Sequence, residues 1–438
     1  MGSRRACRAR RGSQRGQAAL LVVMLVGMAT ALLVYGMVDT TTIALRRDRE
    51  TAAAFAEVKR ALIGWSVQRD PTLHGSNARP GELPCPDMNN DGFEDGNCAA
   101  GAIGRVPWKT LGIPKPKDDA GETLWYAIAG PFRIWNVNMN PINSDTRGNM
   151  IIYRDTTATV VTTEAVAIIF SPGATNGGQV RSCPAPDCDN HVCLPPASST
   201  PICNPANYLE IAATVNNATT NGPFISAPRS DTFNDKIMAI TTADMIPVVE
   251  IRVARALRKI LEDYKLRTPC CTNFGGTTGC YPWADLSDGE SDAHPPNPGS
   301  ERNRGRIPIN IAGPYDWGTN PCGAGALPTM PVWLLNNNWH AVVYYSAGLN
   351  FLGSPVTGDP CTTCVSSTLT VDGVAGKQVV ILMPGPLLGA PPRAPVSMGD
   401  STYWQYYFED PANQDFADDV YVTPASTAYT RDRILTIP

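Results

Sequence analysis

The feature that most limits how this chain can fold is an uncharged, apolar stretch at residues 17–37, QAALLVVMLVGMATALLVYGM. Six arginines and no acidic residue precede it: Arg4, Arg5, Arg8, Arg10, Arg11 and Arg15. About 20 apolar residues in a helix are enough to cross a bilayer, and flanking basic residues favour the cytoplasmic side. No small-residue cleavage site follows the stretch, which argues against a secretory signal peptide. The pattern predicts a single-pass membrane helix with a cytoplasmic N-terminus and the rest of the chain outside.

The residues after this stretch predict that the helix continues. No proline occurs before Pro71, and Phe55, Val58, Leu62 and Trp65 recur at steps of three and four, which places them on one face of a helix. Residues 17 to about 67 can thus form one helix roughly 75 Å long at 1.5 Å per residue, with its second half packed on a globular domain. The alternative is a simple membrane anchor followed by an unrelated helix.

The basic leader ending in Gly16, the apolar segment and its amphipathic continuation resemble the type IV pilin and type II secretion pseudopilin superfamily. The resemblance implies that a prepilin peptidase cuts after Gly16 and leaves Gln17 as the first mature residue. It also implies that the apolar helix is first an inner-membrane anchor and later part of a filament core. Two positions depart from the family: Gln17 replaces the usual Phe or Met, and Leu21 replaces the usual Glu. The missing Glu argues against a major pilin and is compatible with a minor, tip or priming subunit, or with an uncleaved protein.

Composition favours a loop-rich exported protein over a nucleic-acid binder. The 438 residues include 38 Gly and 39 Pro, and charged residues make up 17%. Without the six leader arginines, 30 of the 36 basic residues remain against 40 acidic residues, so the rest of the chain is acidic. The chain has no Gly-x-Ser-x-Gly, His-Glu-x-x-His, Walker or Gly-x-Gly-x-x-Gly motif that would indicate an enzyme. We expect a non-enzymatic protein with no nucleic-acid partner.

Thirteen cysteines divide into Cys7 in the leader and twelve beyond the apolar stretch, as expected for disulfides formed in an oxidising compartment. Spacing predicts a bridge between Cys85 and Cys98. It also predicts two local bridges among a group of four: Cys183, Cys188, Cys193 and Cys203. The remaining disulfide candidates are Cys270, Cys271, Cys280, Cys322, Cys361 and Cys364. The last two have redox-motif spacing, but their Pro/Thr/Ser surroundings favour a structural disulfide.

Residues 87–95, DMNNDGFED, follow the pattern of a short calcium loop. The predicted ligands are hard oxygen donors at alternate positions: Asp87, Asn89, Asp91, the carbonyl of Phe93, and Asp95. Gly92 allows the sharp turn, but the distal Glu and the flanking helices of an EF-hand are missing. The alternative is a polar surface turn cross-linked by Cys85 and Cys98, because Asp, Asn and Gly favour turns in any case.

The chain repeats itself after about 200 residues, a pattern that is typical of duplicated domains. Six segments of the first half return in the same order in the second half. They are VKRAL (58–62) and VARAL (253–257), the Asp-rich turns at 87–95 and 285–292, GRVP (104–107) and GRIP (305–308), AVAIIFSPG (165–173) and QVVILMPG (378–385), YLE (208–210) and YFE (407–409), and NDKI (234–237) and RDRI (431–434). The twelve cysteines also split six per half. Because the second turn is shorter and has Ser287 in place of Asn, Ca²⁺ is predicted for the first head only.

The predicted fold is α+β. A long pilin-like helix with a membrane half and an amphipathic half packs on an antiparallel β-sheet head, and a second, related helix-plus-sheet head follows. The predicted domains are a leader at 1–16, the helix at 17–70, the first head with the calcium-like loop at 71–240, and the second helix and head at 241–438. We expect strands at 150–154, 165–170, 341–345, 368–371, 378–383 and 433–437, and a helix at 242–266 with Pro247 in its first turn.

The ordered pieces LPCPD, calcium-like turn, GR-x-PW, WYA, apolar strand and SPG resemble the heads of a group of proteobacterial prepilin-like proteins, over about residues 17–240. The resemblance implies a structural minor subunit, at the tip or priming position, of a type IV pilus or type II secretion pseudopilus-like filament. Its implied partners are other pilin or pseudopilin subunits, the prepilin peptidase and the inner membrane, with the heads periplasmic or extracellular. The alternative is an uncleaved, anchored binding or adhesion protein that recognises a surface ligand or glycan. A stacking surface for a glycan would use aromatic residues that could equally be core: Tyr281, Trp283, Trp317, Trp333 and Trp339.

Overall fold

The computed structural model of the chain describes twelve segments. They are residues 15–69, 78–134, 141–182, 192–193, 200–284, 303–309, 311, 315–353, 367–386, 407–414, 418–424 and 432–438, with the backbone alone at 15–18, 34–41 and 44. The chain divides into two compact units, Met1–Ala54 and Phe55–Pro438. In the described part of the first unit every residue is helical, and the second unit contains all the sheets.

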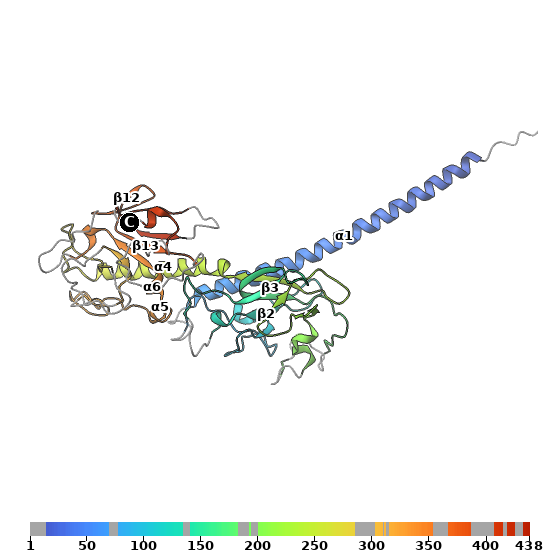
Figure 1. Cartoon of the computed structure of the whole chain (residues 1–438), viewed down its shortest axis with the longest axis horizontal. Coiled ribbons are helices and arrows are strands. Elements are labelled where there is room, and N and C mark those ends of the chain that lie inside the picture. The colour runs from blue at the N-terminus through green and yellow to red at the C-terminus, as the bar shows by residue number, and fades with distance from the viewer. Residues whose placement is uncertain are drawn as a thin grey trace, which may run out of the picture. The chain divides into compact units, whose positions relative to one another are not determined.

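Helix α1 runs over Arg15–Gln68 without a break (Figure 1, blue). In the first unit, its apolar side chains at residues 19–33 are exposed. In the second unit, Phe55, Val58 and Leu62 are at most 5% exposed and Trp65 is half-buried, which confirms the predicted apolar stripe at three of its four positions. The same helix therefore has a stretch that is apolar and exposed and another stretch that belongs to a core.

The prediction of a membrane-spanning half of this helix is overturned. Among the residues that the structure describes, no helix is both long and apolar enough to cross a bilayer. The predicted single-pass inner-membrane localisation, with its cytoplasmic N-terminus, outer heads and membrane partner, is corrected with it.

The first head is built on a six-stranded sheet in the order β1-β2-β4-β3-β7, with β8 paired to β4. The bounds are β1 Ile103–Arg105, β2 Trp125–Ile128, β3 Met150–Tyr153, β4 Val160–Ser171, β7 Phe224–Ile225 and β8 Lys236–Thr241. The N-terminal half of β4 pairs with β3, and its C-terminal half lies between β2 and β8. Residues 165–170 are fully buried, which explains why this strand has a continuous apolar sequence instead of an alternating one.

Short elements connect these strands. They are α3 Trp108–Leu111, the 3-10 turns η1 Gly130–Phe132, η4 Pro201–Cys203 and η5 Pro205–Asn207, and a hairpin of β5 Ile211–Ala212 with β6 Val215–Asn216. Most of them contain proline, which suits loops and helix starts because it lacks a backbone N–H.

Helix α4, Thr242–Leu266, follows β8 directly (Figure 1, yellow-green). Its bounds are those that the sequence predicts. Thr241 and Asp244 form a capping box at its start, which satisfies free N–H groups of the first turn. Pro247 lies inside the helix beyond the predicted first turn, and the helix continues past it. Four apolar residues at steps of four form its buried face: Val249, Val253, Leu257 and Leu261.

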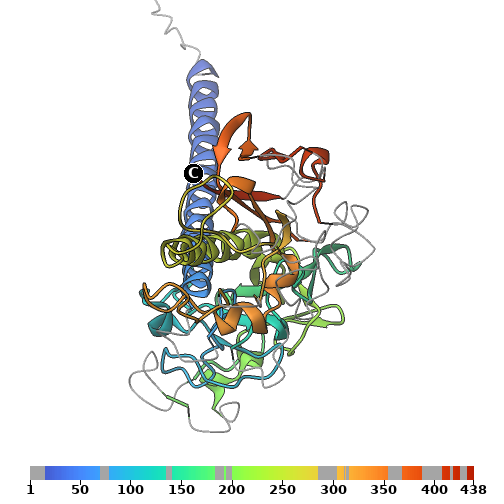
Figure 2. The same ribbon diagram turned by 90° about the vertical axis from the view of Figure 1, so that its left-hand side faces the viewer.

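The second head has a four-stranded sheet in the order β15-β13-β10-β9 and a three-stranded sheet in the order β12-β11-β14. The bounds are β9 Arg304–Arg306, β10 Tyr344–Ala347, β11 Leu369–Val371, β12 Val374–Lys377, β13 Val379–Met383, β14 Val420–Tyr421 and β15 Arg433–Ile437. Its other elements are α5 Val332–Asn336, α6 Trp339–Val342, η6 Leu349–Phe351 and α7 Pro411–Gln414. Figure 2 shows the orange and red strands of this head beside α4, which contacts β13 and β15.

The two heads share one strand order. The sequence β1-β2-β4-β8 in the first head has the same antiparallel neighbours as β9-β10-β13-β15 in the second. The echoed GR motifs lie in β1 and β9, the echoed apolar runs in β4 and β13, and the echoed VKRAL and VARAL segments in α1 and α4. The repeated segments of the sequence thus occupy matching places in the two sheets.

The prediction of antiparallel heads is corrected, because the fold is mixed α/β with parallel pairs in both heads. Strand β3 pairs in parallel with β7, and β11 pairs in parallel with β14. A parallel pair needs a long crossover, and β7 and β14 are two-residue strands that leave no periodic signal in the sequence. The strand expected at 341–345 is also corrected, since α6 occupies residues 339–342 and β10 begins at Tyr344.

Candidate metal centre and neighbouring polar sites

The calcium-like turn, called here the 87–95 loop, is held against β1, the edge strand of the first sheet. The N–H of Asp87 donates to the carbonyl of Arg105 at 3.0 Å, and the N–H of Arg105 donates back to the carbonyl of Asp87 at 2.7 Å. A disulfide joins Cys85 to Cys98 across the base of the loop. The N–H of Cys193 donates to the carbonyl of Asn89 at 2.7 Å. The backbone of the loop is therefore fixed from both sides.

The carboxylates of the loop turn inward and accept hydrogen bonds from its own backbone. The donors are the N–H groups of Gly92 and Asp91 to Asp87 (2.8 and 3.2 Å), of Phe93 to Asp91 (2.7 Å), and of Met88 and Asn89 to Asp95 (2.5 and 3.2 Å). Gly92 has a φ of 87°, a conformation that residues with a Cβ rarely adopt. The predicted alternate-ligand residues are thus brought together in one turn.

The amide of Asn89 stands between two of these carboxylates. Its Nδ2 donates to Asp91 at 3.3 Å and to Asp95 at 3.1 Å, and its Oδ1 accepts from the N–H of Asp91 at 2.9 Å. Within the described residues, no three His, Cys, Asp or Glu side chains are grouped as a metal ion would require. The residue types fit Ca²⁺, which prefers carboxylate and carbonyl oxygens. In this arrangement an amide joins the carboxylates, so Ca²⁺ stays a prediction.

Burial makes the loop carboxyls harder to ionise. Together with the charges of Asp91 and Asp95, burial raises the pKa of Asp87 to about 6 against the opposing effect of the Gly92 N–H. Burial also raises the pKa of Asp95 and of Glu94. A cation bound among these groups would lower their pKa values, because opposite charge favours the ionised form.

The predicted processing site is helical in this structure. Gly16 and Gln17 lie in the first turn of α1, where the backbone alone is described. Leu21, which replaces the glutamate of the pilin pattern, is exposed. Cleavage after Gly16 stays a prediction.

Four disulfides are present in the described residues, which fits an oxidising compartment. Cys85–Cys98 and Cys193–Cys203 are pairings of the kind that spacing predicts, and the adjacent Cys270 and Cys271 bond to Cys322 and Cys280 respectively. Four candidates lie outside the described residues: Cys183, Cys188, Cys361 and Cys364.

The aromatic residues considered as a glycan surface are mostly part of the second head's interior. Tyr281, Trp333 and Trp339 are buried. Trp317 packs on Tyr264 with ring centres 5.0 Å apart, and the indole N–H of Trp283 donates to the carbonyl of Gly353 at 3.2 Å. These contacts describe core packing and give no stacking platform on the surface.

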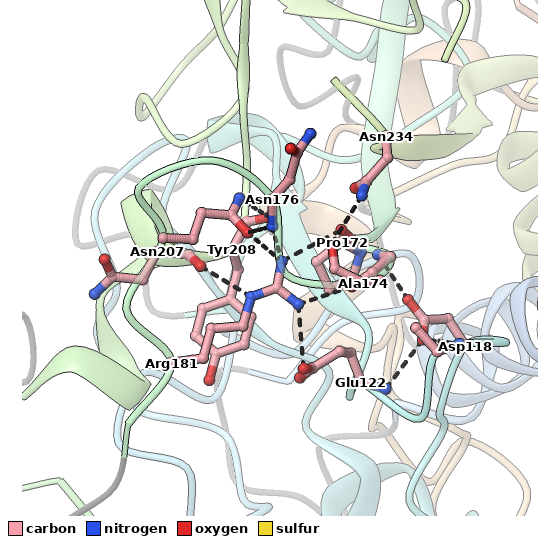
Figure 3. Close-up of polar contacts among 12 residues, drawn as sticks. Asp118, Glu122, Pro172, Ala174, Asn176, Arg181, Asn207, Tyr208 and Asn234 are labelled. Carbon is pink, nitrogen blue, oxygen red and sulfur yellow. Dashed lines mark hydrogen bonds and ion pairs between the residues drawn. The ribbon is translucent and has the colours of Figure 1, made fainter. Parts of the chain in front are cut away.

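Sequence reasoning missed a polar cluster around Arg181 in the first head (Figure 3). Its guanidinium carbon lies 4.7 Å from the centre of the Tyr208 ring, and its Nη1 lies 3.1 Å from a carboxylate oxygen of Glu122. It also donates to several oxygens: the carbonyls of Pro172 (3.4 Å), Gly173 (2.7 Å), Asn207 (3.0 Å) and Tyr208 (3.4 Å), and Oε1 of Gln179 (2.6 Å). Backbone carbonyls carry no residue type, so the sequence offers no signal for this cluster.

Asp118 fixes the opposite side of the cluster. Its carboxylate accepts from the hydroxyl of Ser171 and the N–H of Gly173, both at 2.9 Å, and from the N–H of Glu122 at 3.0 Å. These bonds connect the end of β4 to the turn that carries Glu122 (Figure 3). Hydrogen bonds to the backbone on both sides therefore fix the positions of Arg181 and Glu122.

Each head also contains a pair of carboxyl residues at an echoed position, and the Asp of each pair is buried. In the first head, Asp235 accepts from the N–H of Glu210 and from Nδ2 of Asn217, both at 2.9 Å, and Glu210 accepts from the N–H of Asp235 at 3.2 Å. Burial raises the pKa of Asp235 to about 7.

In the second head, Asp432 accepts from the N–H of Glu409 and from Nδ2 of Asn413, both at 3.4 Å. Burial, together with the hydrogen bond and charge of Glu409, raises its pKa to about 8. The YLE/YFE and NDKI/RDRI echoes contain the four carboxyl residues of the two pairs, so the sequence carried the signal without showing that the segments meet.

Comparison with known proteins adds no family to these observations. No protein-family model, no curated protein and no solved structure matches this chain.

Proposed function

We propose that this protein is a structural subunit of a pilin-like filament, in which residues 19–33 of α1 pack against helices of neighbouring subunits. The proposal depends on one observation, namely the exposure of large apolar side chains throughout this part of the helix. A prepilin peptidase would act after Gly16, as the pilin-like leader implies.

The exposed apolar side chains surround the helix instead of forming one stripe. Leu20, Leu21, Val22 and Val23 are consecutive and all more than half exposed, with Val23 at 71%. Consecutive helical residues point about 100° apart, so these four cover every side. A helix that is apolar all round is normally buried in a larger structure, and burying one such side chain stabilises by about 1.5–3 kcal/mol. Neighbouring helices would supply that burial.

We place the subunit at the tip or priming position of the filament. Leu21 gives no carboxylate to pair with a neighbouring subunit's terminal amine, a contact that the pilin resemblance expects of shaft subunits. The chain carries two heads with the same order of four strands, which is bulky for a subunit repeated along a shaft. The likeness to minor pilins supports the same position.

The test uses the full chain in cells that assemble filaments. A double variant, Leu25→Asp with Leu32→Asp, places two charges on the exposed apolar segment. We expect its amount in the sheared-filament fraction to fall at least about tenfold, since each lost buried leucine corresponds to about one factor of ten or more.

Matched controls place the same charge on equally exposed apolar residues of the heads. Ile211 and Val374 are 57% and 55% exposed, and the double variant Ile211→Asp with Val374→Asp should leave the filament fraction unchanged. Equal loss in the controls, or no loss in the helix variant, would contradict the proposal. Normal unfolding curves for all variants would show that the heads are intact.

Ca²⁺ at the 87–95 loop is a separate part of the proposal. The oxygen ligands Asp87, Asn89, Asp91 and Asp95 already share one turn, and the buried, mutually repelling carboxyls would be stabilised by a cation. When bound, Ca²⁺ would fix the loop that lies against β1. The filament role does not depend on it.

A further inference from the structure

A partly enclosed cavity lies between the 87–95 loop and the Arg181 cluster in the first head. Its volume is about 220 Å³, and its polar lining includes Asn90, Arg105, Lys115, Glu122, Arg181 and Tyr208. Sites for drug-sized ligands are about 300–1,000 Å³, so this cavity suits a smaller molecule, on the scale of a single ring or less.

The lining is strongly basic although the chain as a whole is acidic. The lining contains three cations, Arg105, Lys115 and Arg181, and one carboxylate, that of Glu122, whereas the whole chain has a formal net charge of −4. A concave surface lined by one sign of charge concentrates ligands of the opposite sign. The cavity therefore selects for a negatively charged ligand.

Arg105 is a buried cation of the lining, and one of its N–H donors has no acceptor in the part of the chain that the structure describes. Its side chain lies over Trp125 and Tyr208, at 5.0 and 4.8 Å from the ring centres, and Nη2 donates to the carbonyl of Ile202 at 3.0 Å. Its Nε is buried and has no hydrogen-bond partner among the described residues. Buried donors are nearly always paired with protein, water or a ligand. This guanidinium beside the cavity thus has unused capacity for an acceptor.

Arg181 adds a second guanidinium to the cavity lining. Its donors are occupied by backbone carbonyls, Gln179 and Glu122 (Figure 3), which hold the guanidinium in this position. Both Arg105 and Arg181 lie within 5 Å of the Tyr208 ring centre. The two guanidiniums are held rigidly on one aromatic side chain, and a ligand would meet charge that is already in place.

We propose that this cavity binds a small molecule carrying one oxyanion group, a carboxylate or a phosphate, with Lys115 at the rim and Arg105 as the buried cation. Guanidinium and ammonium groups form their strongest hydrogen bonds with such oxyanions. Glu122 balances part of the charge and would favour ligands with a single negative group. The proposal is independent of the filament role.

The experiment measures binding of three probes to the full chain by calorimetry: inorganic phosphate, D-glucuronate and neutral D-glucose. We expect one anion or both to bind and glucose not to bind, and the better anion identifies the source of the oxyanion. Lys115→Glu reverses a half-buried rim charge and should weaken that anion at least about tenfold, the effect of one lost charge-assisted contact. Glu122→Gln removes the opposing carboxylate and should strengthen it.

The matched control is Lys117→Glu, which makes the same charge change two residues away on an exposed side chain outside the cavity lining. It should stay within about twofold of the original chain at physiological salt, because exposed charges are screened there. Equal weakening of anion binding by Lys117→Glu, or equal binding of glucose, would overturn the proposal. So would the absence of binding by either anion at about 50 mM, because a specific anion site has a Kd well below that concentration. Unchanged unfolding curves would exclude misfolding as the cause.

Discussion

The two heads have the same order of four strands but differ in whether the central strand is continuous. In the first, β4 is one strand of twelve residues that pairs with β3 through its first half and with β2 and β8 through its second half. In the second, the equivalent chain is broken at Gln378 into β12 and β13. The register of β4 against β3 and β8 shifts within the strand. The strand thus stays continuous with irregular pairing in one head and is broken in the other, while the order β1-β2-β4-β8 returns as β9-β10-β13-β15.

The matching registers identify equivalent residues that share no obvious sequence signal. Aligning Arg105 on Arg306 makes Tyr126 the counterpart of Tyr345. The hydroxyl of Tyr126 donates to the carbonyl of Pro84 at 3.2 Å, and that of Tyr345 donates to the carbonyl of Pro282 at 2.8 Å. Two buried tyrosines therefore tie the second strand of each sheet to a proline that precedes it in the chain. This repeated contact supports the duplication more strongly than any single sequence echo.

The largest expected effect comes from opening a cavity at equivalent core positions. Ile169 in β4 and Ile381 in β13 each face the counterpart tyrosine of the neighbouring strand and are at most 1% exposed. Ile169→Ala and Ile381→Ala should each lower the free energy of unfolding by about 2–5 kcal/mol, measured by chemical denaturation.

If the two heads are equivalent, these two losses should agree within about a factor of two. Ile169→Val and Ile381→Val serve as controls and should cost about 0.5–1.5 kcal/mol. A large loss at one position with none at the other would contradict the equivalence of the two strands.

The buried carboxyl pairs should make stability depend on pH in the same direction in both heads. The folded pKa values of Asp235 and Asp432 are raised to about 7 and about 8, above the unfolded value of about 3.9. The protonated carboxyls therefore contribute stability that is fully present below the unfolded pKa. This stability is lost as the pH rises through the folded pKa, by about pH 7 for Asp235 and about pH 8 for Asp432. One such group changes the free energy of unfolding by at most about 1.4 kcal/mol per pH unit.

Asp235→Asn should flatten the pH dependence mainly up to pH 7, and Asp432→Asn up to pH 8, as followed by unfolding at fixed temperature. Asp231→Asn, an exposed residue of the first head, is the control. A pH profile that both variants leave unchanged would show that neither pair titrates in this range.

Calcium should distinguish the heads, because the intact ligand pattern belongs to the first. The equivalent turn of the second head, residues 285–292, lies outside the described residues. At tenfold excess over its Kd, Ca²⁺ should stabilise the chain by about 1.4 kcal/mol, and Asp91→Asn should remove the effect. The stabilisation should also weaken as the pH falls through 6, where Asp87 takes up a proton. Identical melting curves with Ca²⁺ and with a chelator would contradict this part of the account.

The smallest expected effect concerns the repeated tyrosine contact. Tyr126→Phe and Tyr345→Phe each remove one buried hydroxyl and leave a proline carbonyl without its donor. Each should cost about 1 kcal/mol, the typical net value of such a bond. A cost in one head alone would show that the two contacts, though alike in geometry, differ in energy.

The sequence predicted those features that depend on local periodicity. The stripe of Phe55, Val58 and Leu62, the bounds of α4 and strand β15 follow from spacing and caps. The two-residue parallel strands β7 and β14 could not be predicted, since they depend on long connections. The strand expected at 341–345 is displaced because Asn338 adopts a φ of 53° and a helical turn begins at Trp339.

The candidate sites likewise divide into one that local spacing predicts and one that depends on distant segments. The ligand spacing of the 87–95 loop is local and was visible in the sequence, but the Asn89 amide that joins its carboxylates was not. The cavity beside Arg105 and Arg181 could not be predicted, because Lys115, Glu122 and Tyr208 come from separate segments and meet only in the folded head. The membrane prediction came from the apolar run at residues 17–37 and is overturned, since the described helices contain no span of sufficient length and apolarity.

The most direct test of the filament role is mass spectrometry of the chain recovered with sheared filaments. The account predicts that the chain is present in that fraction and begins at Gln17, after removal of the leader at Gly16. A chain that begins at Met1 and never appears with filaments would contradict it, and the exposed segment at residues 19–33 would then need a different partner.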